Sequence, residues 1–421
     1  MNKQLTYLLF IFSCVVLSQE TTTTTSSTRF ILTPEVMAGA MPESNSNFPS
    51  RKFQKQILLS IGWDHDRNMQ EWAQRLKGPR TGISFGYTDF GNSDELGSAL
   101  SIMPFIEFKA FKKENLKVHV GMGASYFNKK YDAISNINNQ AISTDVTWSF
   151  RVFSYYELFQ VEKIDLRIGG GYFHHSNGHS KLPNSGYNSF LLSVSADIKN
   201  KIDPKNGSDP IAKELSNRSY YNYFSLRSGF GENVFSLAFN DRQSIYTLSG
   251  EYGRVFNNTF KIGVGFYYRY YQIYYNYIAN NEFLVRDGNE FDHYKKNPFW
   301  NASNLGISIS GEVLLNHFGI NVQLGINLHK PGYKIDWRIN QGWDNAPIEL
   351  WDGWIFGEFD TKYKLKKTIA SRLGLKYYLI GTKNAPKHNI FIGMDLNANG
   401  GQADFTEVSL GYVYSFNFSA K

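Results

Sequence analysis

The feature that most constrains this chain is a two-residue alternation of apolar and polar side chains, which recurs in segments of roughly ten residues. Turns rich in Gly, Asn, Asp and Lys separate the segments. Successive side chains of a β-strand point to opposite faces, so this period predicts an all-β fold of antiparallel strands. The predicted strands are 56–63, 81–90, 98–108, 116–127, 144–159, 163–176, 188–198, 220–230, 244–253, 260–275, 305–315, 319–329, 369–381, 389–399 and 407–418. The sequence does not decide whether two further segments, 29–39 and 353–365, are strands. The expected number of strands is about 12–16.

The composition says what kind of β-protein this is. Aromatic residues make up 16% of the chain, with 27 Tyr and 33 Phe, yet its mean hydropathy is only −0.37. Beyond the N-terminus the sequence has no run of about 18 apolar residues, which argues against a helical membrane protein. An aromatic outer surface around a polar interior is typical of a transmembrane β-barrel. The net charge of +7 suits an anionic lipid surface.

The last predicted strand supports a closed barrel in the outer membrane of a bacterium. Leu410, Tyr412, Tyr414, Phe416 and Phe418 alternate with smaller residues and share one face. Pairing of the last strand with the first would leave no open edge in lipid. The alternative interpretation is that this segment is the last strand of a soluble sandwich. A mature protein that stays in solution without detergent would support that alternative.

The N-terminus predicts export. Lys3 precedes an apolar run from Leu5 to Ser18, and small residues stand before Gln19, so residues 1–18 are predicted to be a signal peptide. A lipoprotein signal that uses Cys14 is the alternative. Cys14 is the only cysteine, so cleavage would leave a chain without disulfides or Cys-ligated metal. Residues 19–28 are a low-complexity Thr/Ser lead-in.

The remaining chain is predicted to form a single barrel from two parts. Residues 29–200 supply the first half, and 201–421 supply additional strands that complete the barrel. The most polar interruption is 200–218, and long loops are expected at 278–303 and 338–354. Long loops on one side and short turns on the other fit a membrane barrel.

The candidate chemistry lies near the end of the strand 163–176. His174 and Ser176 are two residues apart and share the face of Ile164, Leu166 and Ile168, which is the predicted lipid-facing side. Polar groups at such positions are costly and suggest a function. An imidazole can remove a serine proton and generate a nucleophile for an ester carbonyl. The alternative is that both residues lie at the membrane rim, where polar side chains are ordinary.

Three asparagines could complete this site. Asn188 begins the apolar face of the next strand, so it is expected on the same outer surface as His174. Asn177 and Asn184, with backbone amides of the 178–186 loop, could stabilise an oxyanion.

The stretch from His174 to Ser189 resembles the signature of the lipid A 3-O-deacylase (PagL) family of outer-membrane esterases. The resemblance rests on a His-x-Ser-Asn element followed by Pro-Asn-x-Gly, and the matching residues are His174, Ser176, Asn177, Pro183, Asn184 and Gly186. Strands from about 56 to 198 resemble the family in order and spacing. The resemblance implies that Ser176 is the nucleophile, that His174 is the general base and that an acyl ester of lipopolysaccharide is the substrate.

This chain departs from the family at the orienting acid, because Asn188 stands where the family has an acidic residue. Asparagine can orient imidazole but cannot stabilise imidazolium as a carboxylate does. Either Asn188 suffices, another residue such as Glu157 or Glu251 substitutes, or activity is weak or lost. The resemblance covers less than half of the chain, and 220–421 has no counterpart in it.

Other candidate sites are weaker. Asp64, His65 and Asp66 could ligate a cation but fit a charged turn better, and His179 could contact a lipid phosphate. Lysines 112, 113, 129 and 130 could meet anionic headgroups. No nucleotide or nucleic-acid motif is present, so we expect no cofactor, no metal and no nucleic-acid partner. The predicted function is an outer-membrane lipid A deacylase-like esterase; the alternative is a non-catalytic barrel, a channel or a lipid-binding protein.

Overall fold

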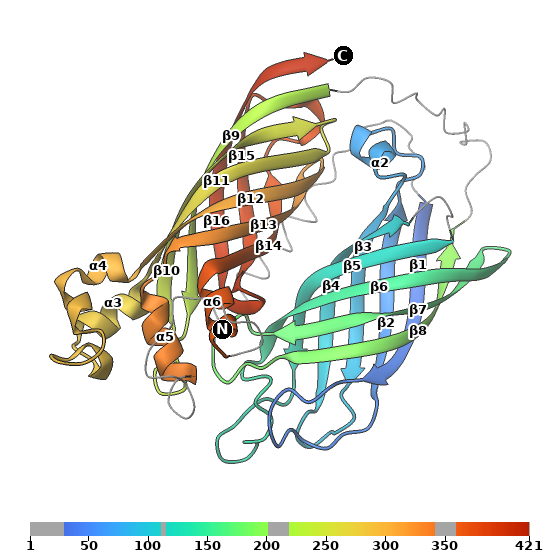
Figure 1. Ribbon diagram of the computed structural model, residues 1–421. Helices are drawn as coiled ribbons and strands as arrows, with labels where there is room; N and C mark the ends of the chain where they lie inside the picture. The colour runs from blue at the N-terminus through green and yellow to red at the C-terminus, as the bar shows by residue number, and fades with distance from the viewer. Residues whose placement is uncertain (1–28, 111–114, 201–218, 342–358, 421) are drawn as a thin grey trace.

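The computed structural model describes residues 29–110, 115–200, 219–341 and 359–420, and it is all-β with a few short helices (Figure 1). Sixteen strands form two closed antiparallel barrels of eight strands each. The predicted fold class and strand number are therefore confirmed. The predicted signal peptide, the Thr/Ser lead-in, Lys112 and Lys113 lie outside the described residues.

Each barrel closes by pairing its first and last strands. In the first barrel, β8 pairs with β1, and in the second, β16 pairs with β9. The first barrel comprises β1 (Arg29–Ala40), β2 (Gln54–Asp64), β3 (Arg80–Asp89), β4 (Ser98–Lys109), β5 (Leu116–Phe127), β6 (Val146–Val161), β7 (Ile164–Ser176) and β8 (Tyr187–Lys199). The second comprises β9 (Ser219–Asn233), β10 (Gln243–Phe256), β11 (Phe260–Tyr271), β12 (Ser303–Leu315), β13 (Phe318–His329), β14 (Ile369–Tyr378), β15 (His388–Asn399) and β16 (Gln402–Ala420).

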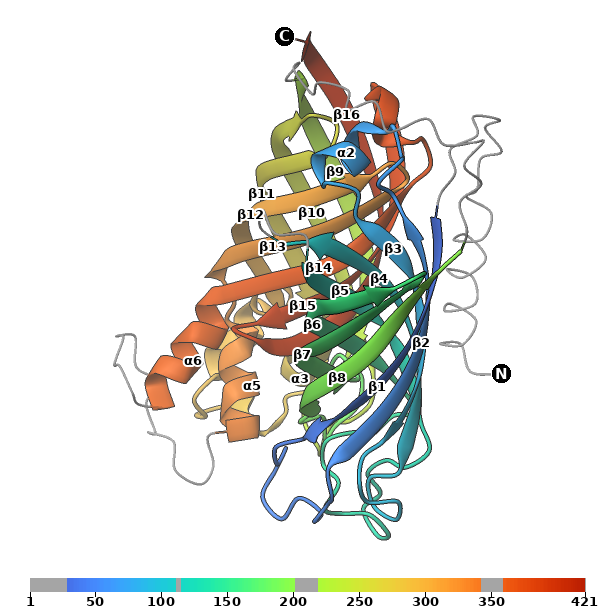
Figure 2. The ribbon, with the colours of Figure 1, turned by 90° about the vertical axis from the view of Figure 1, so that its right-hand side faces the viewer.

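The expectation that 201–421 completes a single wide barrel is wrong. Because β8 pairs with β1 rather than with β9, the sheet is already closed at Lys199, and the remaining strands close a second barrel beside it (Figures 1 and 2). Alternation along a strand says which side chains face outward, but it does not say which strand lies next to which.

Both barrels are apolar outside and polar inside. On β8 the outward Phe190, Leu192 and Val194 are 59%, 75% and 55% exposed, whereas the inward Ser189 and Ser193 are buried. No helix among the described residues is long and apolar enough to cross a membrane.

Side chains fill the interiors, as expected for barrels of eight strands, and many of them form buried ion pairs. In the first barrel, Arg151 lies 3.2 Å from the Glu35 carboxylate, and Arg167 lies 3.0 Å from Asp197. In the second barrel, Glu312 accepts hydrogen bonds from Lys376 (2.8 Å) and from other groups.

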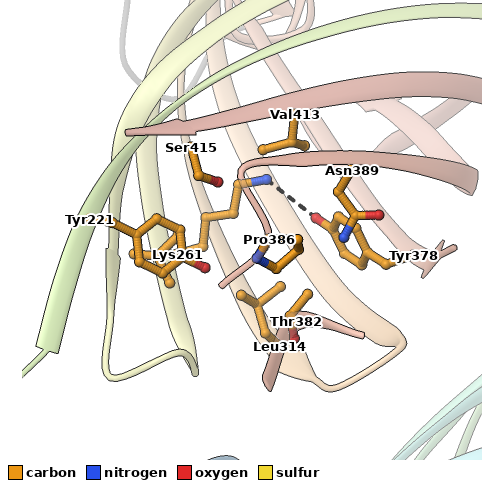
Figure 3. Close-up of a pocket in the computed structure, with 10 residues that line it drawn as sticks. Tyr221, Lys261, Leu314, Tyr378, Thr382, Pro386, Asn389, Val413 and Ser415 are labelled. Carbon is orange, nitrogen blue, oxygen red and sulfur yellow. Dashed lines mark hydrogen bonds between the residues drawn. The ribbon is translucent and has the colours of Figure 1, made fainter. Parts of the chain in front are cut away.

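A cavity in the second barrel shows how little space these side chains leave. It lies between Tyr221, Lys261 and Tyr378 and has a volume of about 20 Å³ (Figure 3). That volume suits one water molecule.

Two ends of each barrel can be distinguished. We call the end at which β1 and β9 begin the terminal end, and the opposite end the loop end. Short helices lie at the loop end of the second barrel (Figure 1). They are α3 (Gln272–Ala279), η2 (Phe283–Val285), η3 (Asp292–Lys296), α4 (Pro298–Asn301), α5 (Gly332–Gln341) and α6 (Phe359–Thr368). Several of them fall in the expected loop 278–303, whereas most of the expected loop 338–354 lies outside the described residues. Of the segment 353–365, which was left open as a strand, residues 353–358 lie outside the described residues and residues 359–365 belong to α6. The terminal end carries α2 (Glu71–Arg75) and η4 (Thr382–Asn384).

Candidate functional site

The hairpin of β7 and β8 places the sequence-predicted residues at the loop end of the first barrel. The inward Asp165, Arg167, Phe173 and His175 of β7 are buried, whereas the outward Ile164 is 40% exposed. His174 and Ser176 follow the outward register of Ile164. The alternation predicts both residues on the outer face of the sheet; in the structure His174 is half-buried and Ser176 is buried.

Asn188 lies directly across the hairpin from His174, since these two residues are Cα partners in the β7–β8 register. The Nδ1 atom of His174 lies 2.8 Å from the Oδ1 atom of Asn188. The hydroxyl of Tyr172 donates to the same Oδ1 atom at 2.5 Å. An oxygen that accepts from Tyr172 also accepts from an Nδ1–H, so this arrangement favours the imidazole tautomer that carries its hydrogen on Nδ1 and has an unprotonated Nε2 atom.

Ser176 is held by the loop that follows it. Its Oγ atom accepts hydrogen bonds from the side-chain amide of Asn184 (2.9 Å) and from the backbone N–H of Gly178 (3.3 Å). Ser176 is only 5% exposed, so the loop covers it, and the hydroxyl does not project openly from the sheet as the sequence suggested. In both hydrogen bonds the Ser176 oxygen is the acceptor, so the hydroxyl hydrogen remains available for donation to a base.

No hydrogen bond joins His174 to Ser176 in the described part of the chain. Catalytic hydrogen bonds are often long without substrate and tighten in the complex. Gly186 gives the imidazole its space, because a Cβ atom there would lie 3.0 Å from Cε1 of His174. Its φ of +74° also belongs to the left-handed region that favours glycine.

Asn177 and Asn184 lie close together but have different surroundings. The Nδ2 atom of Asn177 donates to Ser143 Oγ (3.0 Å) and to the carbonyl of Lys181 (2.6 Å), so this amide braces the loop. The Oδ1 atom of Asn184 accepts from the backbone N–H of Asn177 at 3.0 Å, which turns its NH₂ group toward Ser176. Of the two amides, that of Asn184 is the one placed beside the hydroxyl.

The candidates for a substitute acid do not reach His174. Glu157 pairs with Arg167 in the β6–β7 register, seven residues before His174 on β7, and its carboxylate binds Lys117. Glu251 lies in the second barrel, where it accepts a hydrogen bond from Tyr223. Asn188 is therefore the residue that faces the imidazole.

The remaining polar clusters have protein partners. Glu157, Asp165 and Asp197 group their carboxylates at the terminal end of the first barrel, and each has a cationic partner: Lys117, Lys199 and Arg167, respectively. Among the surface lysines, Lys130 pairs with Asp145.

The turn that was considered as a cation site is built around a neutral histidine. His65 Nε2 lies 2.8 Å from Thr81 Oγ1, Nδ1 lies 3.2 Å from Asn68, and the ring meets the edge of Trp72. Burial lowers the pKa of His65 to about 4. The histidine thus serves to hold the turn before α2.

His179 faces the second barrel. Its backbone carbonyl accepts from the N–H of Val234 at 3.2 Å. Burial raises the pKa of Asp336 in α5, and the nearby charge of His179 opposes that rise.

Sequence reasoning missed Tyr172 and every residue of the second barrel at this site. Tyr172 is one of 27 tyrosines in the chain, so the residue type alone carries no signal. Trp148, the β6 partner of Ser176, donates from Nε1 to Thr406 Oγ1 of the second barrel at 2.8 Å. A contact across 258 residues of sequence leaves no local pattern.

Comparison with known proteins gives two family matches, one in each barrel. Residues 57–197 match the family model for lipid A 3-O-deacylase (PagL), and residues 218–341 match the model for the acyloxyacyl hydrolase C-terminal domain. A comparison with curated proteins finds no match to the chain.

Similar solved structures are outer-membrane proteins. The outer membrane enzyme PagL is 18% identical with a TM-score of 0.29, over 39% of this chain and 97% of that chain. The outer membrane protein OpdK from Pseudomonas aeruginosa is 9% identical with a TM-score of 0.20, over 93% and 99%. The fold assignment itself rests on the strand pairing described above.

Proposed function

Since the first barrel of this chain belongs to the lipid A 3-O-deacylase (PagL) family, we propose that this outer-membrane protein hydrolyses an acyl ester of lipid A with Ser176 as nucleophile and His174 as general base. The single observation that carries the proposal is the geometry on the outward face of β7. There the imidazole is held by Asn188 and the hydroxyl by Asn184, two residues apart on one surface.

The first half of the reaction forms an acyl-enzyme. The Oγ atom of Ser176 bonds to the ester carbonyl carbon while its proton passes to Nε2 of His174. The carbonyl oxygen becomes an oxyanion, and we assign its stabilisation to the Asn184 amide and the Gly178 N–H, which lie beside the Ser176 oxygen. The bond to the sugar oxygen then breaks, and the imidazolium returns its proton to this leaving alcohol.

The second half releases the fatty acid. His174 takes a proton from a water molecule, whose oxygen attacks the acyl carbon, and the proton finally returns to Ser176. The Asn188 oxygen fixes Nδ1–H throughout, as an amide does in the Cys-His-Asn arrangement of other hydrolases.

The outward position of the site agrees with a lipid substrate. Tyr172 and the exposed Phe190 and Leu192 lie on the same outer surface, next to Asn188. An acyl chain in the bilayer reaches the edge of the site at Asn188 along this surface without entering the filled interior of the barrel.

The test is mass spectrometry of lipid A from cells that make the wild-type protein, Ser176→Ala or Ser154→Ala. Ser154 is an exposed serine on β6 and pairs with Gly170, so it is a matched control away from the site. We expect loss of one acyl chain with wild type and with Ser154→Ala, and intact lipid A with Ser176→Ala. Identical acylation in all three strains would refute the proposal.

A further inference from the structure

The loop that carries Asn184, the residue proposed to stabilise the oxyanion, is held by the second barrel. We call residues 177–186 the catalytic loop and residues 234–242, which join β9 to β10, the clamp loop. The two loops meet at the loop ends of the barrels. Asn240 is the central contact: its Oδ1 atom accepts from the backbone N–H of Leu182 at 2.8 Å, and its Nδ2 atom donates to the carbonyl of Leu182 at 2.8 Å.

Two further contacts join the same loops. Val234 donates its N–H to the carbonyl of His179 at 3.2 Å. Arg242 donates from Nε to the carbonyl of Ser180 at 3.2 Å. The clamp loop therefore binds backbone groups of three residues of the catalytic loop, His179, Ser180 and Leu182.

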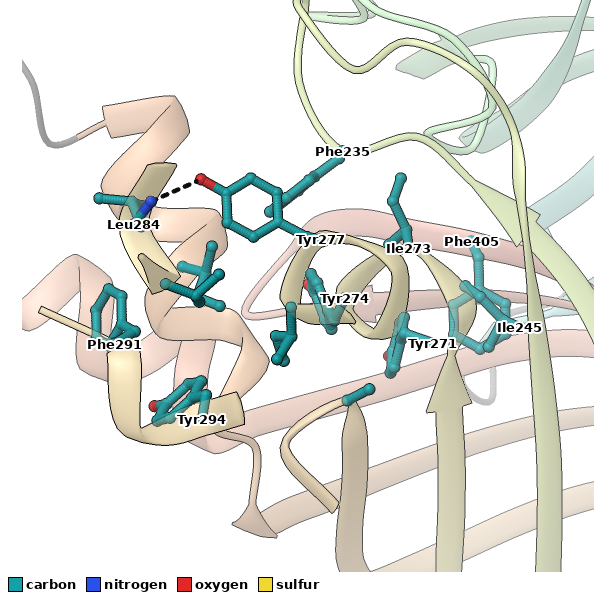
Figure 4. Close-up of a cluster of buried hydrophobic side chains, with 14 residues drawn as sticks. Phe235, Ile245, Tyr271, Ile273, Tyr274, Tyr277, Leu284, Phe291, Tyr294 and Phe405 are labelled. Carbon is teal, nitrogen blue, oxygen red and sulfur yellow. Dashed lines mark hydrogen bonds between the residues drawn. The ribbon is translucent and has the colours of Figure 1, made fainter. Parts of the chain in front are cut away.

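The clamp loop is itself anchored in the second barrel. Phe235 is buried in a cluster of aromatic side chains from α3 and neighbouring segments, 5.5 Å from Tyr274 and 5.4 Å from Tyr277 between ring centroids (Figure 4). Asn340 of α5 donates to the carbonyl of Phe235 at 2.8 Å. Asn240 thus belongs to a loop that is fixed to the second barrel by the packing of Phe235 and by the hydrogen bond from Asn340.

The barrels also touch directly beside Ser176. Gly178, which donates its N–H to Ser176, adopts a φ of +66°. A Cβ atom on Gly178 would lie 2.6 Å from Thr406 Oγ1 and 3.2 Å from Leu396 Cδ1. Both donors to the Ser176 oxygen, Asn184 and Gly178, therefore belong to a loop whose position depends on contact with the second barrel.

We propose that the second barrel completes the active site of the first, and that Asn240 is a positioning residue which acts through Asn184. The inference rests on the function proposed above, since it assigns the second barrel to the same ester hydrolysis. Asn240 fixes Leu182, Leu182 stands two residues before Asn184, and the Asn184 amide faces the Ser176 oxygen. Without Asn240, substrate still binds to the outer surface, but the oxyanion loses a donor held in place before reaction.

The test uses the purified full-length chain in detergent with p-nitrophenyl laurate as the ester. The variants are Asn240→Ala, Asn184→Ala, their double mutant and a matched control, Asn389→Ala. Asn389 makes the same pair of bonds to one residue, accepting from the N–H of Ile380 at 3.1 Å and donating to its carbonyl at 2.7 Å, but at the terminal end of the second barrel.

We expect Asn240→Ala to lower kcat about 10- to 100-fold with KM within about twofold of wild type, since loss of one oxyanion donor costs roughly 10²- to 10³-fold. Asn389→Ala should leave both constants unchanged. Because Asn240 acts through Asn184, the double mutant should be within about threefold of Asn184→Ala alone.

The outcomes separate this inference from the proposed function. If wild type is inactive, or Ser176→Ala is as active as wild type, the proposed function fails. If Ser176→Ala is inactive but Asn240→Ala behaves like Asn389→Ala, or the effects of Asn240→Ala and Asn184→Ala multiply, the positioning role of Asn240 is overturned.

A second variant covers the case in which Asn240→Ala does not fold. Asn240→Asp keeps the oxygen that accepts from Leu182 N–H but loses the donor to the Leu182 carbonyl. We expect a kcat between those of wild type and Asn184→Ala, and a wild-type kcat would contradict the inference.

Discussion

The residue that faces His174 is an amide where the family has an acid, and Asn188→Asp tests what that difference does. Asn188 Oδ1 lies 2.8 Å from His174 Nδ1 and 2.5 Å from the Tyr172 hydroxyl. The substitution keeps the shape of the side chain and the shared acceptor, and it adds a negative charge. In the proposed mechanism a positive charge develops on the imidazole in the transition state, so only the transition state gains the new attraction.

The size of the gain follows from this geometry. Two unit charges 2.8 Å apart attract by roughly 6 kcal/mol at an effective dielectric constant of about 20. That figure is a ceiling, since a carboxylate beside lipid also loses hydration. A neutral hydrogen bond contributes about 1 kcal/mol and one to a charged group about 1.5–3 kcal/mol. A net difference of about 1–1.5 kcal/mol corresponds to a kcat roughly 5- to 13-fold higher.

The assay compares initial rates of p-nitrophenyl laurate hydrolysis by wild type, Asn188→Asp and Asn188→Leu. Leucine removes the acceptor while filling similar space, so we expect Asn188→Leu to lower kcat at least about tenfold through loss of the favoured tautomer. If Asn188→Asp is as slow as Asn188→Leu, the imidazole does not depend on an acceptor at this position and the reasoning is refuted.

Tyr172 gives an independent check of the same argument. Its hydroxyl keeps Oδ1 of Asn188, rather than the NH₂ group, toward His174. Tyr172→Phe should therefore lower kcat about tenfold in the wild-type background, because the amide is free to rotate. The same change should have little effect in the Asn188→Asp background, since both carboxylate oxygens accept.

Three further predictions concern the contacts around the site. Gly178→Ala should lower kcat about tenfold and reduce the thermal midpoint, because the φ of +66° and the short approach to Thr406 both oppose a Cβ atom; unchanged kinetics would contradict this. Burial holds the pKa of His65 at about 4, so its stabilisation is complete above about pH 6.5 and is lost as the pH falls toward 4, by at most about 1.4 kcal/mol per pH unit; the thermal midpoint of His65→Asn should fall less steeply over this range than that of wild type. Arg151→Leu leaves the Glu35 carboxylate buried without its cation and should cost about 3–5 kcal/mol of stability, measured by urea unfolding.

Much of the fold could be predicted from the sequence, because the facing of side chains along each strand depends on the local alternation of apolar and polar residues. The outward register of Phe190 and Leu192 and the inward register of Asp165 and Arg167 follow from side-chain alternation alone. Barrel closure does not follow from it. Whether β8 pairs with β1 or with β9 depends on hydrogen bonds between distant strands, and the polar interruption at 200–218 was the sequence feature that coincided with the change of barrel.

The site divides in the same way. The sequence placed His174, Ser176 and Asn188 on one outer surface, since period and hairpin order are local. It could not separate the bracing amide of Asn177 from the amide of Asn184, because both stand in a loop without a repeating geometry. The role of Asn240 could not be predicted from the sequence, because its contact with Leu182 exists only when two separately closed barrels lie side by side.

The position of the site can be understood from the cost of polar groups on the outside of a barrel. An imidazole, a hydroxyl and two amides facing lipid would be destabilising if they lacked partners. Here His174 and Asn188 satisfy each other, and Asn184 and Gly178 satisfy Ser176. The second barrel covers the loop that supplies these partners, so the polar groups are shielded from lipid on one side while the β7–β8 surface stays open on the other. A second barrel with a filled interior can therefore contribute through its outer surface, which is the surface that meets both the first barrel and the lipid.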